Sequence, residues 1–261
     1  MRDVYYLEAR DAVVDAGIDP DEFARRHALL LLKPDAAITG AMRPAVSWLL
    51  GQGYRITGAY PVQLTRLHLR ALWYGNWHRA TPQRRRLADR LAGLSESVLL
   101  VVTHPDDDIA VSARLTAQKG PADPALRQPG QLRSVLSAGT YLLNLVHSTD
   151  GPDDVLRELG VLFAEPELSE VVLGCAAARD ASAGALRLAD RVESGVRRRS
   201  GDLDAALDAA WAELSAAAPV ARPQTPEAWL GALADAQRHG IDLDIWYRLV
   251  IESAYLPMHR T

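Results

Sequence analysis

A single histidine in the middle of the chain has neighbours that suit nucleophilic chemistry. His147 follows an apolar run and leads into a polar turn that contains Thr149 and Asp150. Asn144 precedes the histidine by three residues, and Glu158 follows it by eleven on a segment with the pattern of a capped helix. An imidazole that one carboxylate orients through one ring nitrogen keeps its other nitrogen free to attack. The spacing therefore predicts that His147 is a nucleophile and that Glu158 orients it.

Lysine is scarce in this chain, and one lysine lies where chemistry is expected. Of 29 basic side chains only Lys33 and Lys119 are lysines, so the others are all arginines. In such a background a lysine that remains indicates a need for a compact ammonium group. Lys33 ends an apolar run and precedes Pro34, and we predict a functional role for it. We attribute Lys119, in a polar loop, to chance.

Strand and helix patterns alternate around these residues. Unbroken or alternating apolar runs predict strands, whereas apolar residues at helical spacing predict the helices between them. The predicted strands are residues 27–35, 54–64, 97–104 and 139–150, and the predicted helices are 42–53, 64–74, 83 onward, 107–118 and 151–163. Residues 119–134 are too rich in proline and glycine for regular structure, and a loop of this length usually has a function.

The order of these elements contains the βαββαβ arrangement of a ferredoxin-like fold, an α+β architecture in which helices cover an antiparallel sheet. A doubly wound parallel sheet is the competing interpretation, but no glycine-rich phosphate loop follows the first strand. We predict a helical segment at residues 1–25, the main domain at 26–165 and an all-helical extension at 166–261. The extension is rich in alanine and has no catalytic motif, so we expect it to pack on the core or on another subunit.

Composition limits the classes of partner and location. The formal net charge of -4 gives no general attraction to nucleic acid or to anionic membranes. Charged residues interrupt the first residues of the chain, and no later stretch is apolar enough to span a bilayer. Cys175 is the only cysteine, which excludes an internal disulfide and a thiolate metal cluster. We therefore expect a cytoplasmic protein with no nucleic-acid or membrane partner.

Several short motifs occur in an order that resembles the nucleoside diphosphate kinase family. They are LLLLKPDA at residues 29–36, PGQLR at 129–133, NLVHSTD at 144–150 and ELGVLF at 158–163. Each motif is weak by itself, but the ordered set is specific. The resemblance covers roughly half of the chain, and the helical extension lies outside it.

The resemblance implies a ping-pong phosphotransferase in which a nucleoside triphosphate phosphorylates His147 and a diphosphate then accepts the group. By position it implies that Lys33 neutralises the transferred group, that Glu158 orients the histidine, and that nucleotide or phosphate binding falls to Tyr74, Arg114, Arg133, Asn144 and Thr149. It also implies magnesium held between the phosphates without a dedicated set of protein ligands. The expected partners are nucleotides or a phosphorylated small molecule, and the expected assembly is a homo-oligomer.

The sequence departs from the family where the family places an aromatic ring over the nucleobase. This region is rich in arginine instead, and Trp77, His78 or the plane of an arginine could stack on a base. Binding of phosphates and exposure on a solvated helix face are equally open interpretations for Arg79, Arg84, Arg85 and Arg86. Three hypotheses follow: an enzyme for common diphosphates, a diverged phosphotransferase for a specialised small molecule or modified nucleotide, and a non-catalytic nucleotide-binding module.

Overall fold

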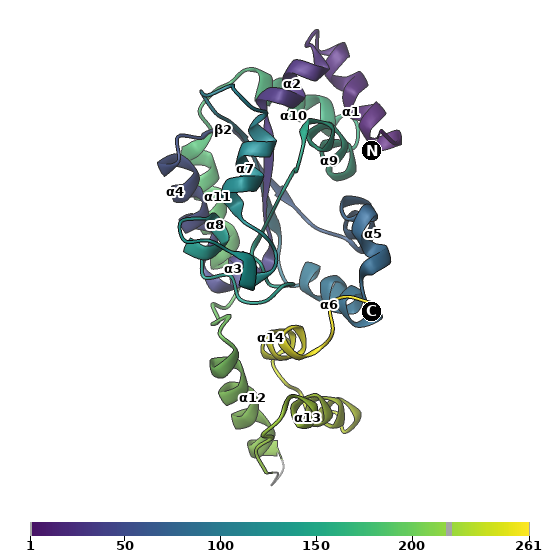
Figure 1. Ribbon diagram of the computed structural model, residues 1–261, viewed down its shortest axis with the longest axis vertical. Coiled ribbons are helices and arrows are strands. Elements are labelled where there is room, and N and C mark those ends of the chain that lie inside the picture. The colour runs from purple at the N-terminus through teal and green to yellow at the C-terminus, as the bar shows by residue number, and fades with distance from the viewer. Residues whose placement is uncertain (1, 218–220, 261) are drawn as a thin grey trace.

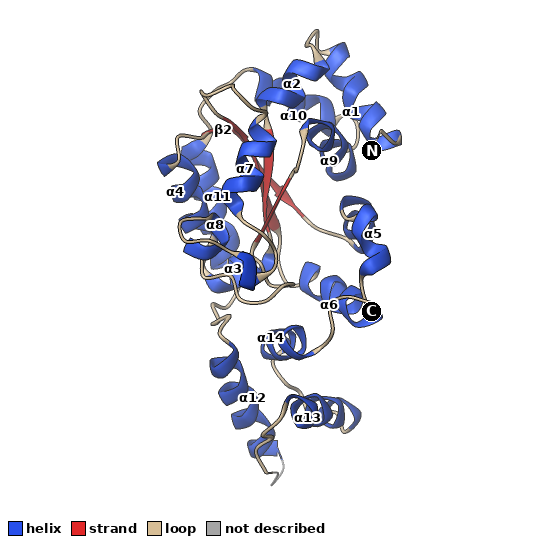
Figure 2. Cartoon of the chain, viewed as in Figure 1, coloured by secondary structure: helices blue, strands red, loops and turns tan. Residues whose placement is uncertain are grey.

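A four-stranded antiparallel sheet lies at the centre of the protein (Figures 1 and 2). The computed structural model describes residues 2–217 and 221–260. The strands lie in the order β2-β3-β1-β4, and every neighbouring pair is antiparallel. Their bounds are β1 Ala28–Leu32, β2 Arg55–Val62, β3 Ser97–Thr103 and β4 Val146–Ser148. This is the strand order of a ferredoxin-like fold, so the predicted α+β class is confirmed.

Helices cover both faces of this sheet, which explains the unbroken apolar run in β1. Leu29 and Leu31 face one hydrophobic cluster, while Leu30 and Leu32 face the other. Because successive side chains point to opposite faces of a strand, both faces need apolar residues. Burial of each leucine contributes roughly 1.5 to 3 kcal/mol. The covering helices are α1 Val4–Asp15, α2 Pro20–Arg26, α9 Pro152–Leu162 and α10 Glu167–Ala176 on one face, and α4 Met42–Gly51, α7 Val111–Lys119 and α11 Ser182–Ser194 on the other.

The N-terminal helices α1 and α2 pack on the core, and α1 lies directly against α9. The Asp3 side chain caps α1, and the Asp19 side chain caps α2. The two helices approach most closely at Gly160, where a β-carbon would lie 2.2 Å from the carbonyl oxygen of Tyr5. Glycine is therefore required there by the backbone of α1.

Strand β4 is much shorter than the strand predicted for residues 139–150. Upstream of it, side chains bond to the local backbone: Thr140 Oγ1 accepts from the Leu143 N–H, and Asn144 Nδ2 donates to the Tyr141 carbonyl. Such bonds compete with a strand ladder. Leu145 also has a φ of 68°, which is incompatible with extended backbone. The strand pairing with β1 is therefore limited to His147 and the residue on each side of it.

Short helical elements connect the strands beside the site. Helix α3 (Pro34–Thr39) follows β1, and α5 (Arg66–Leu72), the 3-10 helix η1 (Tyr74–Arg79) and α6 (Pro82–Ala92) lie between β2 and β3. The proline-rich stretch after α7 contains only η2 (Pro124–Leu126) and α8 (Leu132–Val135). Side chains cap α5 and α6 through Thr65 and Thr81.

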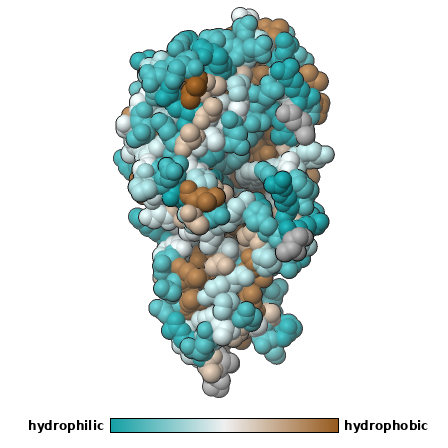
Figure 3. Space-filling model, in the orientation of Figure 1, coloured by the Kyte–Doolittle hydropathy of each residue, from teal (hydrophilic) through white to brown (hydrophobic). Residues whose placement is uncertain are grey.

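The last three helices form a cluster of their own, made of α12 Leu203–Ala217, α13 Pro226–Arg238 and α14 Ile245–Tyr255. Ile38 and Leu91 join this cluster to α3 and α6. On the face drawn in Figure 3, hydrophilic residues cover most of the upper part, and hydrophobic residues gather in the lower part around these helices. Helices α10 and α11, which fall inside the extension predicted at 166–261, cover the sheet instead.

The chain after α14 returns to the start of α6. Thr81 Oγ1 donates to the Pro257 carbonyl at 2.6 Å, and Arg260 Nε donates to the Ala80 carbonyl at 3.1 Å. The ring of His259 meets the ring of Tyr141 edge to face, with the centroids 4.6 Å apart. In the described ranges 2–217 and 221–260, no helix combines the length and the apolar character that crossing a bilayer requires.

Candidate active site

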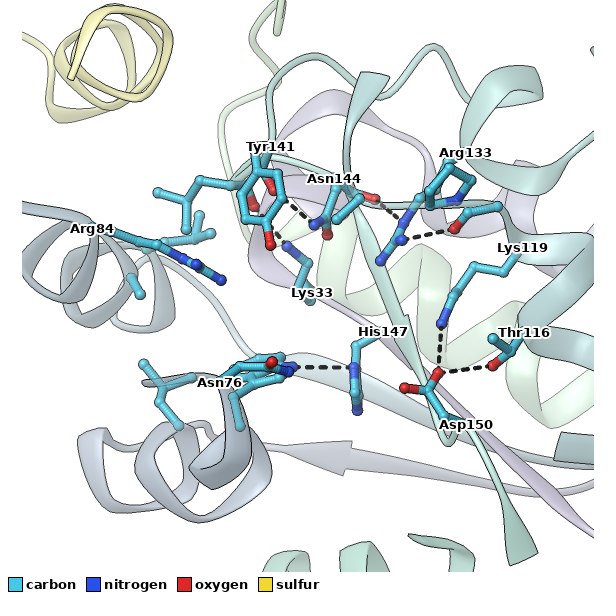
Figure 4. Close-up of a pocket in the computed structure, with 18 of the residues that line it drawn as sticks. Lys33, Asn76, Arg84, Thr116, Lys119, Arg133, Tyr141, Asn144, His147 and Asp150 are labelled. Atoms are coloured by element: carbon cyan, nitrogen blue, oxygen red, sulfur yellow. Dashed lines mark hydrogen bonds and ion pairs between the residues drawn. The ribbon is translucent and has the colours of Figure 1, made fainter. Parts of the chain in front are cut away.

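A cavity of about 510 Å³ opens between the sheet and the α5–α6 segment (Figure 4). Its first wall, which we call the sheet wall, carries Lys33, Asn144, His147 and Asp150 in or beside strands β1 and β4, together with Lys119 at the end of α7 and Arg133 on α8. Its second wall, which we call the helical wall, carries Trp73, Asn76, Trp77, Arg84 and Tyr141. Acidic, basic and aromatic groups from distant parts of the chain therefore face one space.

Both ring nitrogens of His147 have protein partners. The Nε2 atom lies 2.9 Å and 3.0 Å from the two carboxylate oxygens of Glu158, and the Trp73 indole nitrogen lies 3.2 Å from Nδ1. An indole N–H can only donate, so Nδ1 must be an acceptor and the proton of the neutral imidazole is on Nε2, where it is donated to the carboxylate. The lone pair of Nδ1 therefore accepts the Trp73 N–H, and it can act as a nucleophile once that N–H turns away.

The pairing of β4 with β1 fixes the position of His147. The histidine stands opposite Leu31, and Thr149 secures the end of the strand because its Oγ1 accepts from the Leu29 N–H at 3.1 Å. Glu158 projects from α9, the helix that starts just after β4. Thr149 is fully buried and does not line the cavity. Its geometry supports the strand that carries the nucleophile and gives it no direct contact with a ligand in the cavity.

Lys33 lies at the end of β1 and is buried in the sheet wall. Its ammonium group donates to the Leu142 carbonyl at 3.0 Å and lies 3.4 Å from a carboxylate oxygen of Asp35. Burial lowers the pKa of Lys33, and the negative charge of Asp35 opposes that shift. The same Asp35 oxygen accepts from the Leu145 N–H at 2.8 Å, which ties the lysine to the turn before β4.

Lys119 also lies in the sheet wall, contrary to its assignment to chance. Its side chain is buried, and its ammonium group donates to Ser148 Oγ at 2.6 Å and lies 3.7 Å from Asp150. Burial, followed by repulsion from Arg133, lowers the pKa of Lys119 to about 8. The rarity of lysine was a signal that applied to both lysines and could have identified this one.

The buried guanidinium of Arg133 bonds only to backbone carbonyls. It donates from Nε to Asn144 at 3.3 Å, from Nη1 to Gly120 at 2.8 Å and from Nη2 to Val146 at 2.6 Å. Burial, followed by repulsion from the neighbouring Arg127, lowers the pKa of Arg133 to about 10. Arg133 therefore joins the loop after α7 to the turn before His147.

Besides Thr149, the predicted binding residues Tyr74 and Arg114 do not face the cavity. Tyr74 is 64% exposed on η1, and the preceding Trp73 contacts His147 instead. Arg114 pairs with Asp106 and Asp108 outside the cavity. Each residue of a helix turns the side chain by about 100°, so the cavity-facing pair Thr116 and Lys119 leaves Arg114 on another side of α7. In this structure Tyr74 and Arg114 therefore have no contact with a ligand in the cavity, and Trp73 lies beside His147.

The arginine-rich region contributes one side chain to the cavity. Arg84 lines the helical wall, and its guanidinium carbon lies 4.7 Å from the Tyr141 ring centroid and 5.9 Å from that of Trp77. Arg85 and Arg86 line a separate groove with Arg66 and Arg70. His78 and Arg79 are exposed. Of the candidates for base stacking, only Trp77 and Arg84 reach the cavity.

The acidic residues near the cavity decide whether it suits magnesium. In the described part of the chain, no cluster of three or more histidine, cysteine, aspartate or glutamate side chains could hold a metal ion. Asp150 is the one carboxylate among the described residues that line the cavity. Magnesium commonly binds proteins through one or two carboxylates together with substrate phosphates and water. The donor set therefore suits an ion that arrives with phosphates.

Comparison with known proteins gives one family. The family model described as nucleoside diphosphate kinase matches residues 26–168. A nucleoside diphosphate kinase from Thermococcus kodakarensis is 30% identical over 146 residues, which are 55% of this chain and 80% of that protein. One from Staphylothermus marinus is 28% identical over 146 residues, covering 54% of this chain and 95% of that protein. A solved structure of the Aquifex aeolicus nucleoside diphosphate kinase has a TM-score of 0.45 at 20% identity and covers 54% of this chain and 96% of that chain.

Proposed function

Because the chain belongs to the nucleoside diphosphate kinase family, we propose that it moves the terminal phosphoryl group of a nucleoside triphosphate to a diphosphate acceptor through phosphorylated His147. The observation that carries the proposal is the set of contacts to the imidazole: the Glu158 carboxylate lies at Nε2, the Trp73 N–H points at Nδ1, and the ring lines a cavity together with Lys33 and Lys119. A neutral imidazole beside cations is suited to attack an anionic phosphoryl group.

In the first half of the reaction, the Nδ1 lone pair forms a bond to the terminal phosphorus. The bond between that phosphorus and the bridging oxygen breaks, and the nucleoside diphosphate leaves with the bonding electrons. The proton remains on Nε2, where the Glu158 carboxylate stabilises the positive charge that develops on the ring. In the second half, an oxygen of the acceptor diphosphate attacks the phosphorus, and the electrons return to Nδ1.

The remaining residues of the sheet wall position the phosphates. Positive charge from Lys33 and Lys119 offsets the charge on the phosphoryl oxygens, and the Trp73 indole N–H can turn from Nδ1 to a phosphoryl oxygen. Asn144 lines the cavity and could hold a hydroxyl group of the substrate. A magnesium ion bound with the phosphates, next to Asp150, would supply further neutralising charge.

Covalent labelling tests this proposal. The protein, as the full chain, is incubated with ATP labelled on the terminal phosphate and with magnesium. We expect label on His147 that is lost in acid and retained in base, and we expect none on His147→Ala, which should remain folded by circular dichroism. A folded parent protein that takes up no label would contradict the proposal and favour a non-catalytic nucleotide-binding module.

The identity of the acceptor is a separate question, because the helical wall differs from the family where the base is bound. An arginine, Arg84, lies against aromatic rings in this wall. A specialised small molecule or modified nucleotide is therefore the second candidate acceptor. Chasing the labelled protein with common nucleoside diphosphates separates the two: rapid loss of label supports the common acceptors, and stable label supports a specialised one.

A cytoplasmic location and a homo-oligomeric assembly belong to the same proposal. The oligomer is expected because most soluble oligomers are symmetric assemblies of one chain. Light scattering coupled to size-exclusion chromatography measures it directly, and a mass of one chain at working concentration would contradict it.

A further inference from the structure

The cations of the sheet wall already have protein acceptors. The Arg133 fork donates to three carbonyls, Lys33 donates to one and pairs with Asp35, and Lys119 donates to Ser148 and pairs with Asp150. Point charges on the two lysines still act on an anion across the cavity. An arginine can also bind two phosphate oxygens at once through parallel N–H groups. Arg133 could do so only by giving up its hydrogen bonds to the backbone.

Arg84 is the cavity arginine whose guanidinium remains available. In the part of the chain that the structure describes, this guanidinium makes no hydrogen bond and no ion pair, while its backbone N–H donates to Thr81 Oγ1 at the start of α6. Figure 4 shows the side chain reaching from α6 into the cavity, toward the space between Tyr141, Lys33 and His147. Its N–H donors therefore face the region in which the phosphates are proposed to bind.

The neighbours of Arg84 limit how it can meet a ligand. Its guanidinium carbon lies 4.7 Å from the Tyr141 ring centroid and 5.9 Å from that of Trp77. Aromatic rings attract the planar group and hold it in place. The rings accept no hydrogen bond from the group among the described residues, so its N–H donors remain for a ligand. An edge of parallel N–H groups binds phosphate oxygens in pairs.

The C-terminal part of the chain braces this arrangement. His259 packs edge to face on Tyr141, and Pro257 accepts a hydrogen bond from Thr81, the residue that caps α6. Both groups that position the Arg84 side chain, the ring and the helix cap, are thus held by residues from beyond the family match at 26–168.

We infer that Arg84 is a phosphate-binding residue of this site, and that it grips oxygens of the oligophosphate chain of the nucleotide through the edge of its guanidinium. This inference rests on the proposed function for the identity of the ligand. Stacking on the nucleobase, the other role open to an arginine in this wall, would leave these N–H donors without acceptors among the described residues.

Binding of inorganic tripolyphosphate, which has no base, tests the inference without turnover. We expect Arg84→Ala to bind it at least ~10-fold more weakly than the parent, about 1.4 kcal/mol, and Arg84→Lys to recover only part of that loss because an ammonium lacks the fork. Arg85→Ala and Arg86→Ala are matched controls on the same helix that face a separate groove, and each should bind within ~2-fold of the parent, as expected of contacts outside the site.

Two outcomes would overturn the inference. The first is equal affinity of the parent and Arg84→Ala for tripolyphosphate, with both proteins folded by circular dichroism. The second is a loss of affinity for ADP without a loss for tripolyphosphate, which would assign Arg84 to the base. Failure of the proposed function looks different: His147 would take up no label, while tripolyphosphate binding would still depend on Arg84. Where turnover is measurable, a rise in KM should accompany the loss of binding.

Discussion

The two walls of the cavity differ in how their charged groups are held. In the sheet wall, Arg133 and Lys33 donate to backbone carbonyls of Gly120 and of the segment that precedes His147. In the helical wall, Arg84 and Trp77 are positioned by ring contacts, and the Arg84 guanidinium has no acceptor among the described residues. Positive charge in the first wall therefore also stabilises the fold, whereas in the second it is reserved for a ligand.

This difference shows how one cavity can combine rigidity with adaptability. A buried cation needs nearby acceptors to offset the loss of hydration, and backbone carbonyls provide them in a fixed geometry. Such a wall gives the nucleophile constant surroundings, as electrostatic preorganisation requires. A half-exposed arginine against aromatic rings loses less hydration and can adjust to the ligand. Each of the following experiments compares the walls, in order of decreasing expected effect.

The largest difference should appear in stability. Arg133→Ala removes the donor to three buried carbonyls and should lower the free energy of unfolding by about 3 kcal/mol. Arg84→Ala, its counterpart in the helical wall, should stay within about 0.5 kcal/mol of the parent. Urea unfolding followed by circular dichroism measures both. An equal loss of unfolding free energy in Arg133→Ala and Arg84→Ala would contradict the proposed difference between the two walls.

The orientation of the nucleophile depends on Glu158, which reaches His147 of the sheet wall from α9. Glu158→Gln keeps an oxygen near Nε2 but removes the negative charge that stabilises the ring during transfer. We expect the rate of phosphoryl transfer to fall ~10 to 100-fold, as for the loss of an orienting partner of a ligand histidine. Rapid-mixing measurements of labelling provide the rate. Transfer as fast as in the parent would show that Glu158 does not orient His147.

The charge of Lys119 should make ligand binding sensitive to pH. Since burial lowers its pKa to about 8, the side chain loses its proton as the pH rises through that value. Affinity for tripolyphosphate should therefore fall above pH 8 by several-fold, less than the tenfold that 1.4 kcal/mol represents. Lys119→Met should bind more weakly at neutral pH and lack this part of the pH dependence. Tripolyphosphate also titrates in this range, and its contribution cancels when the pH profile of Lys119→Met is subtracted from that of the parent.

Stability should respond to the same lysine in the opposite direction. In the unfolded chain a lysine titrates near ~10.4, so between about pH 8 and that value the unfolded state holds more protons than the folded state. The contribution of Lys119 to stability therefore rises with pH across this window. Comparison of the parent with Lys119→Met in urea at several pH values measures it, and a difference that does not change with pH would contradict the assignment.

The smallest effect is expected from the helical wall, at the contact between Trp73 and Nδ1. Trp73→Phe removes the N–H that favours an unprotonated Nδ1. A hydrogen bond of this kind contributes about 1 kcal/mol, so transfer should slow by only a few-fold. Nitrogen chemical shifts of the His147 ring report the tautomer. A ring that is protonated only on Nε2 in both proteins would leave Glu158 as the sole determinant.

Much of the fold follows from apolar patterns in the sequence, because strands buried on both faces require unbroken apolar runs such as residues 28–32. The length of the last strand, β4, does not follow from these patterns. Residues 139–145 are apolar enough for a strand, but Thr140 and Asn144 bond to the local backbone, and Leu145 takes a positive φ. Competition between side-chain and ladder hydrogen bonds has no signature in apolar spacing.

The site was predictable where residues lie next to strand ends. His147, Lys33 and Asn144 lie in or beside strands β1 and β4 and reach the cavity, because a strand restricts the direction of the side chains at its end; Arg133 reaches it from α8. Tyr74 and Arg114 do not, since a shift of one or two positions along a helix turns a side chain by about 100° or 200°. No pattern in these helices fixes that rotation.

The other residues of the cavity were recognised only in part. Arg84 had two equally open interpretations, and Lys119 was assigned to a loop without a role. Both face the cavity because of contacts between segments that are distant in sequence: α6 with the Tyr141 turn, and the end of α7 with Ser148. Long-range contacts of this kind are decided by packing, which a single sequence does not display.

The close contact at Gly160 restricts which residues can evolve at this position. Any residue with a β-carbon at this position would collide with the carbonyl of Tyr5 and push α1 away from the helix that carries Glu158. The position of α1 and the absence of a side chain at residue 160 thus depend on each other. A lineage that carries α1 in this place must keep glycine at position 160, and a lineage that has lost the helix is released from that requirement.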